Sequence, residues 1–252
     1  MINNRTDKST NSFRIAILIP SYNEGKYIGA VIKKCCKYNQ DIIVVNDGST
    51  DNTGDVLKKL KSEISGKLII INHDANKGKG EALKTGFDHI VKNDYFGAIT
   101  IDADGQHDVE EIRDFLDEIK KNNPDLIVGS RFNNTKGMPF IRRFVNYFTS
   151  WIISCIAGKK IEDVQSGYRF LNYKVLKNIK LKTKNFDTES EILLKAGWLN
   201  YKITNIPIKT IYYMDEFKSH VNPAKDTIKF FKLVFRSIIW KRKLFKEIKK
   251  RK

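Results

Sequence analysis

Short apolar runs alternate with stretches of helical spacing over residues 13–131, and this alternation restricts the fold more than any other feature of the chain. Near-continuous apolar runs of this length are typical of strands that are buried on both faces. The expected strands are 13–20, 41–45, 67–72, 99–102 and 126–130. Strands that alternate with helices predict an α/β fold with a mostly parallel central sheet and helices on both of its faces.

Acids, glycines and an aromatic side chain follow the ends of these strands. In a parallel sheet, ligands bind in the crevice at the carboxyl ends of the strands. We therefore expect the residues at these ends to line one binding site. They are Pro20, Tyr22, Glu24, Asp47, Ser49, Asn76, Gly78, Asp102, Asp104 and Arg131.

Asp102 and Asp104 stand one residue apart at the end of the fourth expected strand. Carboxylate oxygens suit Mg²⁺ or Mn²⁺ bound to a diphosphate better than they suit zinc. The alternative is a polar loop with a turn at Asp104 and Gly105, since two aspartates separated by one residue are common. The neighbouring loops favour the metal site, because they supply further parts of one site in the order that a sheet requires.

Two further loops admit either a structural or a ligand-binding interpretation. The segment 47–51 is either a turn with a helix cap or a loop in which Asp47 accepts hydrogen bonds from a nucleoside. The segment 76–80 lacks the glycine spacing of known phosphate-loop and dinucleotide fingerprints. Its glycines would let the backbone approach a ligand, with Lys77 or Lys79 near anionic oxygens. Otherwise it is a flexible basic turn before a helix.

The chain of 252 residues carries a formal net charge of +17, which implies a polyanionic partner. Nucleic acid, a phosphate-rich substrate and an anionic membrane all satisfy this condition. The sequence has no zinc-finger, helix-turn-helix or RNA-recognition motif, so we expect no specific binding of nucleic acid. The hydrophobic share of 41% is that of a globular protein with a sizeable core.

Residues 223–252 are expected to form one basic amphipathic helix beyond a single domain at 13–222. Phe235, Trp240 and Phe245 belong to its apolar side, and lysines and arginines are interleaved with them. This pattern is typical of a helix at a membrane interface. The alternative is a helix that packs on the domain and ends in a frayed basic tail.

The remaining features predict a cytoplasmic protein. Residues 1–12 are polar, so we expect a disordered terminus and no signal peptide. The longest apolar stretch, 144–157, is too short and too interrupted to span a bilayer. The three cysteines, Cys35, Cys36 and Cys155, lack metal-type spacing and fit a reducing compartment.

Four motifs occur in order along the chain. They are 19–24 (IPSYNE), 45–51 (VNDGSTD), 76–80 (NKGKG) and 102–107 (DADGQH). Together they resemble glycosyltransferase family 2, in particular its branch similar to dolichol-phosphate mannose synthase and bacterial polyprenyl-phosphate glycosyltransferases. The likeness continues through 129–132, 163–169, 186–189 and 218–223, so it covers most of residues 13–235. Each motif is weak alone, but the ordered set is strongly specific.

The resemblance implies a GT-A fold and an inverting transfer of a sugar from a UDP- or GDP-sugar to a polyprenyl phosphate. Asp102, Asp104 and Gln106 would hold Mg²⁺ or Mn²⁺ on the diphosphate, where the cation offsets the charge of the departing nucleotide. Arg131, Arg142 and Arg143 would receive the phosphate of the acceptor lipid. The residues implied for the donor nucleotide and sugar are Pro20, Tyr22, Glu24, Asp47, Ser49, Gly78, Lys79, Asp102, Ala103, Lys218, Ser219 and His220.

Asp163 and Asp104 are the candidate catalytic residues. Asp163 is the leading candidate for the general base, or for a residue that orients the acceptor. An acceptor phosphate is already an anion near neutral pH, so removal of a proton would give little acceleration. A sugar hydroxyl would need Asp163 as a true base, a role worth ~10²–10⁴-fold in rate. Glu189 and Glu191 are either acids on the acceptor side or structural residues.

Other functions are compatible with part of this pattern. A family 2 enzyme could glycosylate a saccharide hydroxyl, as in the synthesis of cell-surface polysaccharide, and a basic nucleic-acid-binding module lies outside the family. A sugar-1-phosphate nucleotidyltransferase is disfavoured, because its glycine-rich loop with arginine and lysine does not follow the first strand. Many members of the branch append transmembrane helices. We expect this chain to be peripheral at the cytosolic face of the membrane, held by anionic lipid or by a membrane-protein partner.

Overall fold

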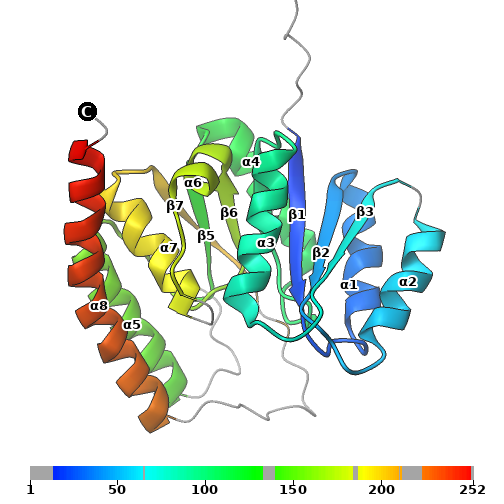
Figure 1. Ribbon diagram of the computed structural model, residues 1–252, viewed down its shortest axis with the longest axis horizontal. Helices are drawn as coiled ribbons and strands as arrows, with labels where there is room; N and C mark the ends of the chain where they lie inside the picture. The colour runs from blue at the N-terminus through cyan, green and yellow to red at the C-terminus, as the bar shows by residue number, and fades with distance from the viewer. Residues whose placement is uncertain are drawn as a thin grey trace, which may run out of the picture.

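The structure is a computed structural model that describes residues 14–64, 66–132, 140–183, 187–209, 211 and 223–250. A seven-stranded sheet runs through its centre in the order β3-β2-β1-β4-β6-β5-β7 (Figure 1). The strands are β1 (Ile15–Ser21), β2 (Asp41–Asn46), β3 (Leu68–Asn72), β4 (Gly97–Thr100), β5 (Leu126–Ser130), β6 (Arg169–Asn172) and β7 (Ile203–Pro207). β6 is antiparallel to β4 and β5, and every other pair is parallel. The expected α/β fold with a mostly parallel sheet is confirmed.

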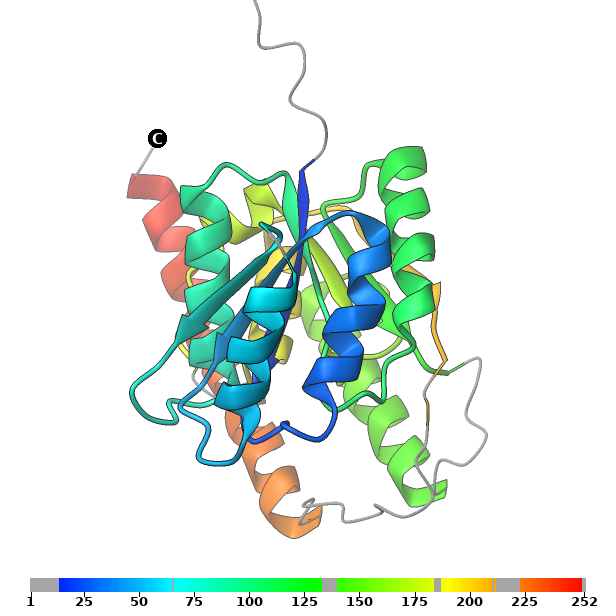
Figure 2. The ribbon, with the colours of Figure 1, turned by 90° about the vertical axis from the view of Figure 1, so that its right-hand side faces the viewer.

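Helices cover both faces of the sheet (Figures 1 and 2). They are α1 (Ile28–Cys35), α2 (Thr53–Glu63), α3 (Lys79–Lys92), α4 (Ile112–Asn122), α5 (Phe140–Ala157), α6 (Tyr173–Asn178), α7 (Asp187–Trp198) and α8 (Pro223–Lys250). Buried side chains of α1, α2 and α4 pack on one face, and those of α3, α6 and α7 pack on the other. α5 and α8 pack against α7 at the side of the domain.

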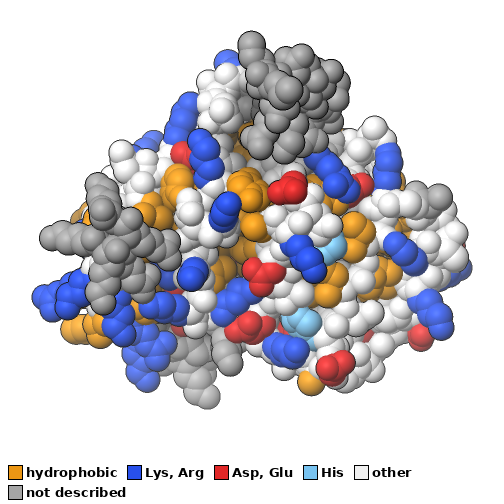
Figure 3. Space-filling model, turned by 45° about the horizontal axis from the view of Figure 1, so that its top comes forward, with side chains coloured by type: hydrophobic (Ala, Val, Ile, Leu, Met, Phe, Trp, Pro, Cys, Tyr) orange, Lys and Arg blue, Asp and Glu red, His pale blue; other side chains and the backbone are white. Residues whose placement is uncertain are grey.

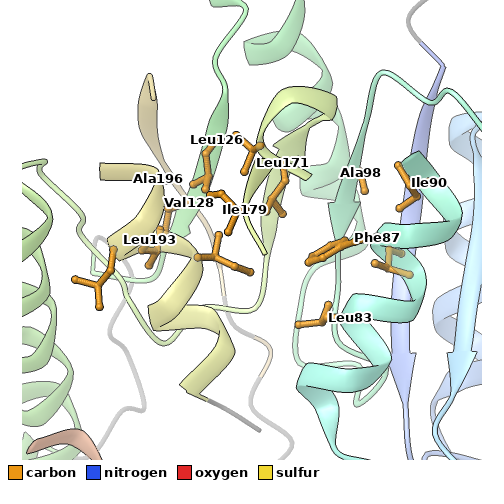
Figure 4. Close-up of a cluster of buried hydrophobic side chains, with 14 of the residues drawn as sticks. Leu83, Phe87, Ile90, Ala98, Leu126, Val128, Leu171, Ile179, Leu193 and Ala196 are labelled. Atoms are coloured by element: carbon orange, nitrogen blue, oxygen red, sulfur yellow. The ribbon is translucent and has the colours of Figure 1, made fainter. Parts of the chain in front are cut away.

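The two apolar layers form because side chains alternate between the two faces of each strand. On β1, Ile17 faces the layer of α1 and α4, whereas Leu18 faces the layer of α3. Figure 4 shows Phe87 of α3 and Leu193 of α7 in this second layer, on the face of the sheet that these helices cover. Buried on both faces, the sheet forms a fixed platform for the loops at its carboxyl edge.

Strand β6 decides what lies beside the carboxyl end of β4. Arg169, at its start, pairs with Thr100 at the end of β4 and with Val128 of β5. Because β6 runs in the opposite direction, the segment 163–168 that precedes it reaches the same edge as the ends of the parallel strands. The Thr100 hydroxyl donates to the Gly167 carbonyl at 2.7 Å, which fixes this segment beside β4.

The chain that leaves β7 continues along this edge. The backbone N–H of Ile211 donates to the Gln106 carbonyl at 2.9 Å. The backbone N–H of Lys209 donates to the Glu111 carboxylate at 2.5 Å. Residues 209 and 211 therefore lie beside the loop that follows β4.

Helix α8 packs on the domain through one side only. Leu233 and Ser237 are buried, whereas Phe235, Ile238 and Ile239 are each more than half exposed. No helix in the described part of the chain is long and apolar enough to cross a bilayer. Residues 1–12, expected to be a disordered terminus, lie outside the described ranges.

Candidate active site

Asp47, directly after β2, accepts hydrogen bonds from within the chain. Its Oδ1 accepts from the backbone N–H of Lys77 at 3.0 Å and lies 2.6 Å from His73 Nδ1. Its Oδ2 accepts from the backbone N–H of Gly78 at 2.8 Å. His73 Nε2 lies 2.9 Å from the Thr85 hydroxyl on α3. This carboxylate therefore holds two of the expected site segments together, the loop after β2 and the glycine-rich turn before α3.

The loop after β1 is tied to the loop after β2. Asn23 takes a left-handed conformation with φ 57°, which asparagine tolerates better than most residues. Its backbone N–H donates to the Ser49 hydroxyl at 3.0 Å, and that of Glu24 donates to the Thr53 hydroxyl at 2.9 Å. Beside these contacts the Tyr22 side chain is 42% exposed. An aromatic surface is thus available to a ligand at the edge of the sheet.

Asp102 follows β4 and forms an ion pair with Lys79, the first residue of α3. Asp102 Oδ1 lies 2.7 Å from Lys79 Nζ, and the same ammonium lies 2.8 Å from Glu189 Oε1 on α7. Pro20 lines the small cavity around this cluster. Burial alone would raise the pKa of Asp102, but the nearby positive charges, of which Lys79 contributes most, together outweigh it and lower the pKa to about 2. Asp102 is therefore ionised at neutral pH.

His107 contacts both the backbone and the carboxylate of Asp102. The backbone N–H of Asp102 donates to His107 Nδ1 at 3.1 Å, and His107 Nε2 lies 3.9 Å from Asp102 Oδ2. The imidazole stacks on the Tyr168 ring with 5.0 Å between centroids. Burial lowers the pKa of His107, so the ring is neutral and its Nδ1 serves as a hydrogen-bond acceptor.

Asp104 and Gln106 continue the same loop and have the chemistry of a divalent-cation site. Asp104 Oδ1 accepts from the backbone N–H of Gln106 at 2.9 Å. Burial and then the charge of Asp102 raise the pKa of Asp104, an unfavourable crowding that a divalent cation would relieve. Carboxylate and amide oxygens fit Mg²⁺ or Mn²⁺. Within the described ranges no three His, Cys, Asp or Glu side chains form a metal site alone, so other oxygens would complete the coordination.

Arg131, directly after β5, is paired with Asp163. Its Nε donates to Asp163 Oδ2 at 2.6 Å and its Nη2 donates to Oδ1 at 2.8 Å. The Asp163 side chain is only 1% exposed. Burial alone would raise the pKa of Asp163, but the hydrogen bonds from Arg131 lower it below its usual value. Both carboxylate oxygens are engaged by the guanidinium, which is thereby held at the carboxyl edge of the sheet.

Comparison with known proteins identifies the family. Residues 16–183 match the family described as Glycosyl transferase family 2. The chain belongs to glycosyltransferase family 2. It is 36% identical over 215 residues to UDP-N-acetylglucosamine--dolichyl-phosphate N-acetylglucosaminyltransferase of Methanococcus voltae, covering 79% of this chain and 86% of that protein.

Two further similarities extend the comparison. Polyprenol monophosphomannose synthase of Mycolicibacterium smegmatis is 27% identical over 205 residues, which are 77% of this chain and 76% of that one. The mannosyltransferase PcManGT from Pyrobaculum calidifontis, solved with GDP-Man and Mn²⁺, superposes with a TM-score of 0.62 at 14% identity, over 90% of this chain and 65% of that one. The family 2 enzyme therefore has the expected GT-A fold.

Several of the predicted site residues lie close together in this family 2 enzyme. Pro20, Lys79 and Asp102 line one cavity, and Asp47 joins the loops that flank it. Ala103 is buried in the apolar core. Arg143 is exposed on α5. Lys218, Ser219, His220 and the side chain of Arg142 lie outside the described part of the chain, so their predicted roles stay predictions.

Three relationships in the site were not predicted from the sequence. Glu189 pairs with Lys79, His73 contacts Asp47, and Gly167 lies against Asp102. The glycine in the motif 163–169 could have pointed to the contact of Gly167 with Asp102. That prediction would have required knowing that β6 is antiparallel, because only then does the motif reach the end of β4.

Proposed function

We propose that this glycosyltransferase moves a sugar, with inversion, from a UDP- or GDP-sugar to a polyprenyl phosphate at the cytosolic face of a membrane, with Mg²⁺ or Mn²⁺ as cofactor. The names of the relatives support this, since one pairs UDP-N-acetylglucosamine with dolichyl phosphate and one is a polyprenol monophosphomannose synthase. The fold neighbour that was solved with GDP-Man and Mn²⁺ supports the cofactor.

The ion pair of Arg131 and Asp163 is the observation that favours a phosphate acceptor over a sugar hydroxyl. A sugar hydroxyl must lose a proton as it attacks, and this needs a base with an available oxygen and a pKa near the working pH. Both oxygens of Asp163 accept from Arg131, and its pKa is lowered. A phosphate monoester is already an anion and needs no such base. Asp163 then serves to orient Arg131, whose planar fork suits phosphate oxygens.

In the proposed reaction an oxygen of the acceptor phosphate forms a bond to the anomeric carbon on the face opposite the nucleotide. The bond from that carbon to the diphosphate breaks, and its electron pair leaves with the nucleoside diphosphate. A bound divalent cation supplies Lewis-acid compensation for the charge that develops there. Asp104 and Gln106 would hold the cation, with Asp102 beside it, and the loops of Tyr22 and Asp47 would orient the nucleotide.

The acceptor lipid is confined to a bilayer, and the surface of α5 and α8 suits contact with one. Among the described residues, the large apolar side chains that are exposed all lie on these two helices, apart from Tyr22. Trp151 of α5 is 57% exposed and Phe235 of α8 is 72% exposed. Lys and Arg side chains gather over α8, at the left of Figure 3. Aromatic side chains with cationic neighbours favour the interface of an anionic membrane.

Transfer into a lipid product tests the proposal. Labelled UDP-N-acetylglucosamine, UDP-glucose and GDP-mannose are each incubated with the protein, Mn²⁺ and anionic vesicles that contain undecaprenyl phosphate. We expect one donor to give an organic-soluble product, and EDTA or the Asp104→Asn substitution to abolish it. A water-soluble glycoside formed equally well without the lipid phosphate would instead favour a saccharide acceptor. Turnover that is unaffected by EDTA would contradict the cofactor.

A further inference from the structure

Lys79 lies within contact distance of two carboxylates that come from different elements, the loop after β4 and helix α7. Its Nζ is 2.7 Å from Asp102 Oδ1 and 2.8 Å from Glu189 Oε1. The Lys79 side chain is 20% exposed and that of Glu189 is 9% exposed, so water screens these contacts only partly. The ammonium therefore links the start of α3, the loop after β4 and the start of α7.

Asp102 has little freedom to turn away from Lys79. Its Oδ2 lies against the backbone of Gly167, and a Cβ added to Gly167 would lie 2.6 Å from this oxygen. Its backbone N–H donates to His107 at 3.1 Å. One oxygen of this carboxylate is thus engaged by Lys79 and the other is packed against the 163–168 segment. A divalent cation that uses Asp102 must compete with the ammonium for it.

The local charges make this competition strong. Asp102, Asp104 and Glu189 supply three carboxylates, and Lys79 supplies one compensating charge at contact distance from two of them. Arg131 and Arg169 also act electrostatically on Asp102. Removal of the Lys79 ammonium would still leave the carboxylates with less compensating charge, which favours capture of a divalent cation. A nucleotide diphosphate brings its own negative charge and so has the same effect when Lys79 is present.

We infer that Lys79 is a built-in counter-cation that neutralises Asp102 until the donor arrives, so that the divalent cation binds tightly only together with the nucleotide diphosphate. Glu189 is the second partner that retains Lys79 when the cation takes over Asp102. The ammonium then loses one of two contacts rather than its only one, which lowers the cost of release. This inference rests on the proposed metal-dependent glycosyl transfer and concerns the order in which its ligands bind.

Mn²⁺ affinity, measured by the electron paramagnetic resonance signal of free Mn²⁺, tests the role of Lys79 without turnover. The wild type is titrated with Mn²⁺ alone and with Mn²⁺ plus UDP or GDP. We expect weak binding alone and much tighter binding with one nucleotide. Lys79→Met should bind Mn²⁺ alone about tenfold more tightly than the wild type, because the competing charge is gone. Lys79→Arg, which keeps the charge, should stay close to the wild type.

A matched control is Lys77→Met, which removes the same charge two residues earlier, just before α3 begins. We expect it to leave the affinity for Mn²⁺ alone near the wild-type value. Equal tightening by Lys77→Met, or no tightening by a folded Lys79→Met, would overturn the inference. No Mn²⁺ binding by the wild type with any nucleotide would instead overturn the proposed cofactor, so the two failures are distinct.

Glu189→Gln should change the Mn²⁺ affinity in the opposite direction, and it remains a test of the inference if Lys79→Met does not fold. With nucleotide present it should weaken Mn²⁺ binding about tenfold, because Lys79 is left with Asp102 as its carboxylate partner in the pair. Glu81→Gln, which removes a carboxylate from the first turn of α3, is the control. In the Lys79→Met background, Glu189→Gln should have a much smaller effect. An unchanged affinity in Glu189→Gln would contradict the inference.

Discussion

The backbone of Gly167 lies directly against the carboxylate of Asp102. A Cβ on Gly167 would be 2.6 Å from Asp102 Oδ2 and 2.9 Å from Oδ1, closer than a side-chain carbon and a carboxylate oxygen can approach. Gly167 is held there because its carbonyl accepts from the Thr100 hydroxyl at 2.7 Å. Glycine at this position leaves Asp102 free to pair with Lys79.

We expect Gly167→Ala to displace Asp102 and to lower kcat/KM by ~10²-fold, since misplacement of a catalytic group by about 1 Å has effects of this size. Gly54→Ala on α2 is the control, because a Cβ there meets nothing within 4 Å. It should leave activity unchanged and raise the free energy of unfolding by less than the ~0.5–1 kcal/mol that alanine gains over glycine in the middle of a helix, because Gly54 is the second residue of α2. Wild-type turnover by Gly167→Ala would show that the position of Asp102 does not limit the reaction.

Asp163 and Arg131 should act as one unit. We expect Asp163→Asn to abolish transfer to a polyprenyl phosphate, because Arg131 loses the charged partner that orients it. Arg131→Lys keeps the charge but loses the two-pronged contact, so kcat/KM should fall at least about tenfold. The double variant should be no worse than the more severe single one, as for residues that work together.

Additive losses in that cycle would mean that the two residues act separately. High activity of Arg131→Lys combined with inactivity of Asp163→Asn would restore Asp163 as a general base. Unfolding should be followed in parallel, because removing one charge of a buried pair costs up to ~3–5 kcal/mol of stability. The Asp163 side chain is only 1% exposed, so such a loss is expected here.

Glu111 should make stability depend on pH near neutrality. Its carboxylate is buried, and its Oε2 lacks a hydrogen-bond partner within the described part of the chain. Burial raises the pKa of Glu111 to about 7, only partly offset by the hydrogen bond from Lys209. The folded state therefore keeps a proton that the unfolded chain, with a pKa of about 4.3, has already lost. Stability contributed by this proton is present at acid pH and is lost as the pH rises through 7.

We expect Glu111→Gln to remove that dependence while keeping an acceptor for the Lys209 N–H. The free energy of unfolding, measured in urea at pH 5, 6, 7 and 8, should fall less steeply for the variant than for the wild type. Glu110→Gln is the control, because the neighbouring Glu110 side chain is 64% exposed. Parallel curves for Glu111→Gln and the wild type would show that Glu111 titrates alike in both states.

Local sequence predicted the parts of the fold that depend on continuous apolar runs. β1, β2 and β5 begin and end within two residues of their expected limits, since buried strands leave a clear hydrophobic signal. β6 and β7 gave no such signal: β6 is four residues long and starts with Arg169, and β7 contains Thr204 and Asn205. Pairing with neighbouring strands, which is a tertiary effect, determines these two.

The same division holds in the site. The loops after β1, β2 and β4 were predicted to meet because the carboxyl ends of parallel strands share one edge. The contacts of Asp102 with Gly167 and of Lys79 with Glu189 join segments about 65 and 110 residues apart, so no local pattern contains them. For Asp163 the motif predicted a place in the site, but only the structure shows that both of its carboxylate oxygens accept hydrogen bonds from Arg131.

The membrane surface can be tested apart from the chemistry. Each cationic residue near an anionic bilayer contributes ~1 kcal/mol, so replacing Lys241, Arg242 and Lys243 of α8 by glutamine should weaken binding to anionic vesicles by about 10²-fold. Replacing Lys33, Lys34 and Lys120 removes the same charge from exposed positions of α1 and α4 and should have little effect. Co-sedimentation with vesicles at low and high salt measures both, and the difference should shrink at high salt. Equal losses in the two variants would show that net charge, and not the surface of α8, governs attachment.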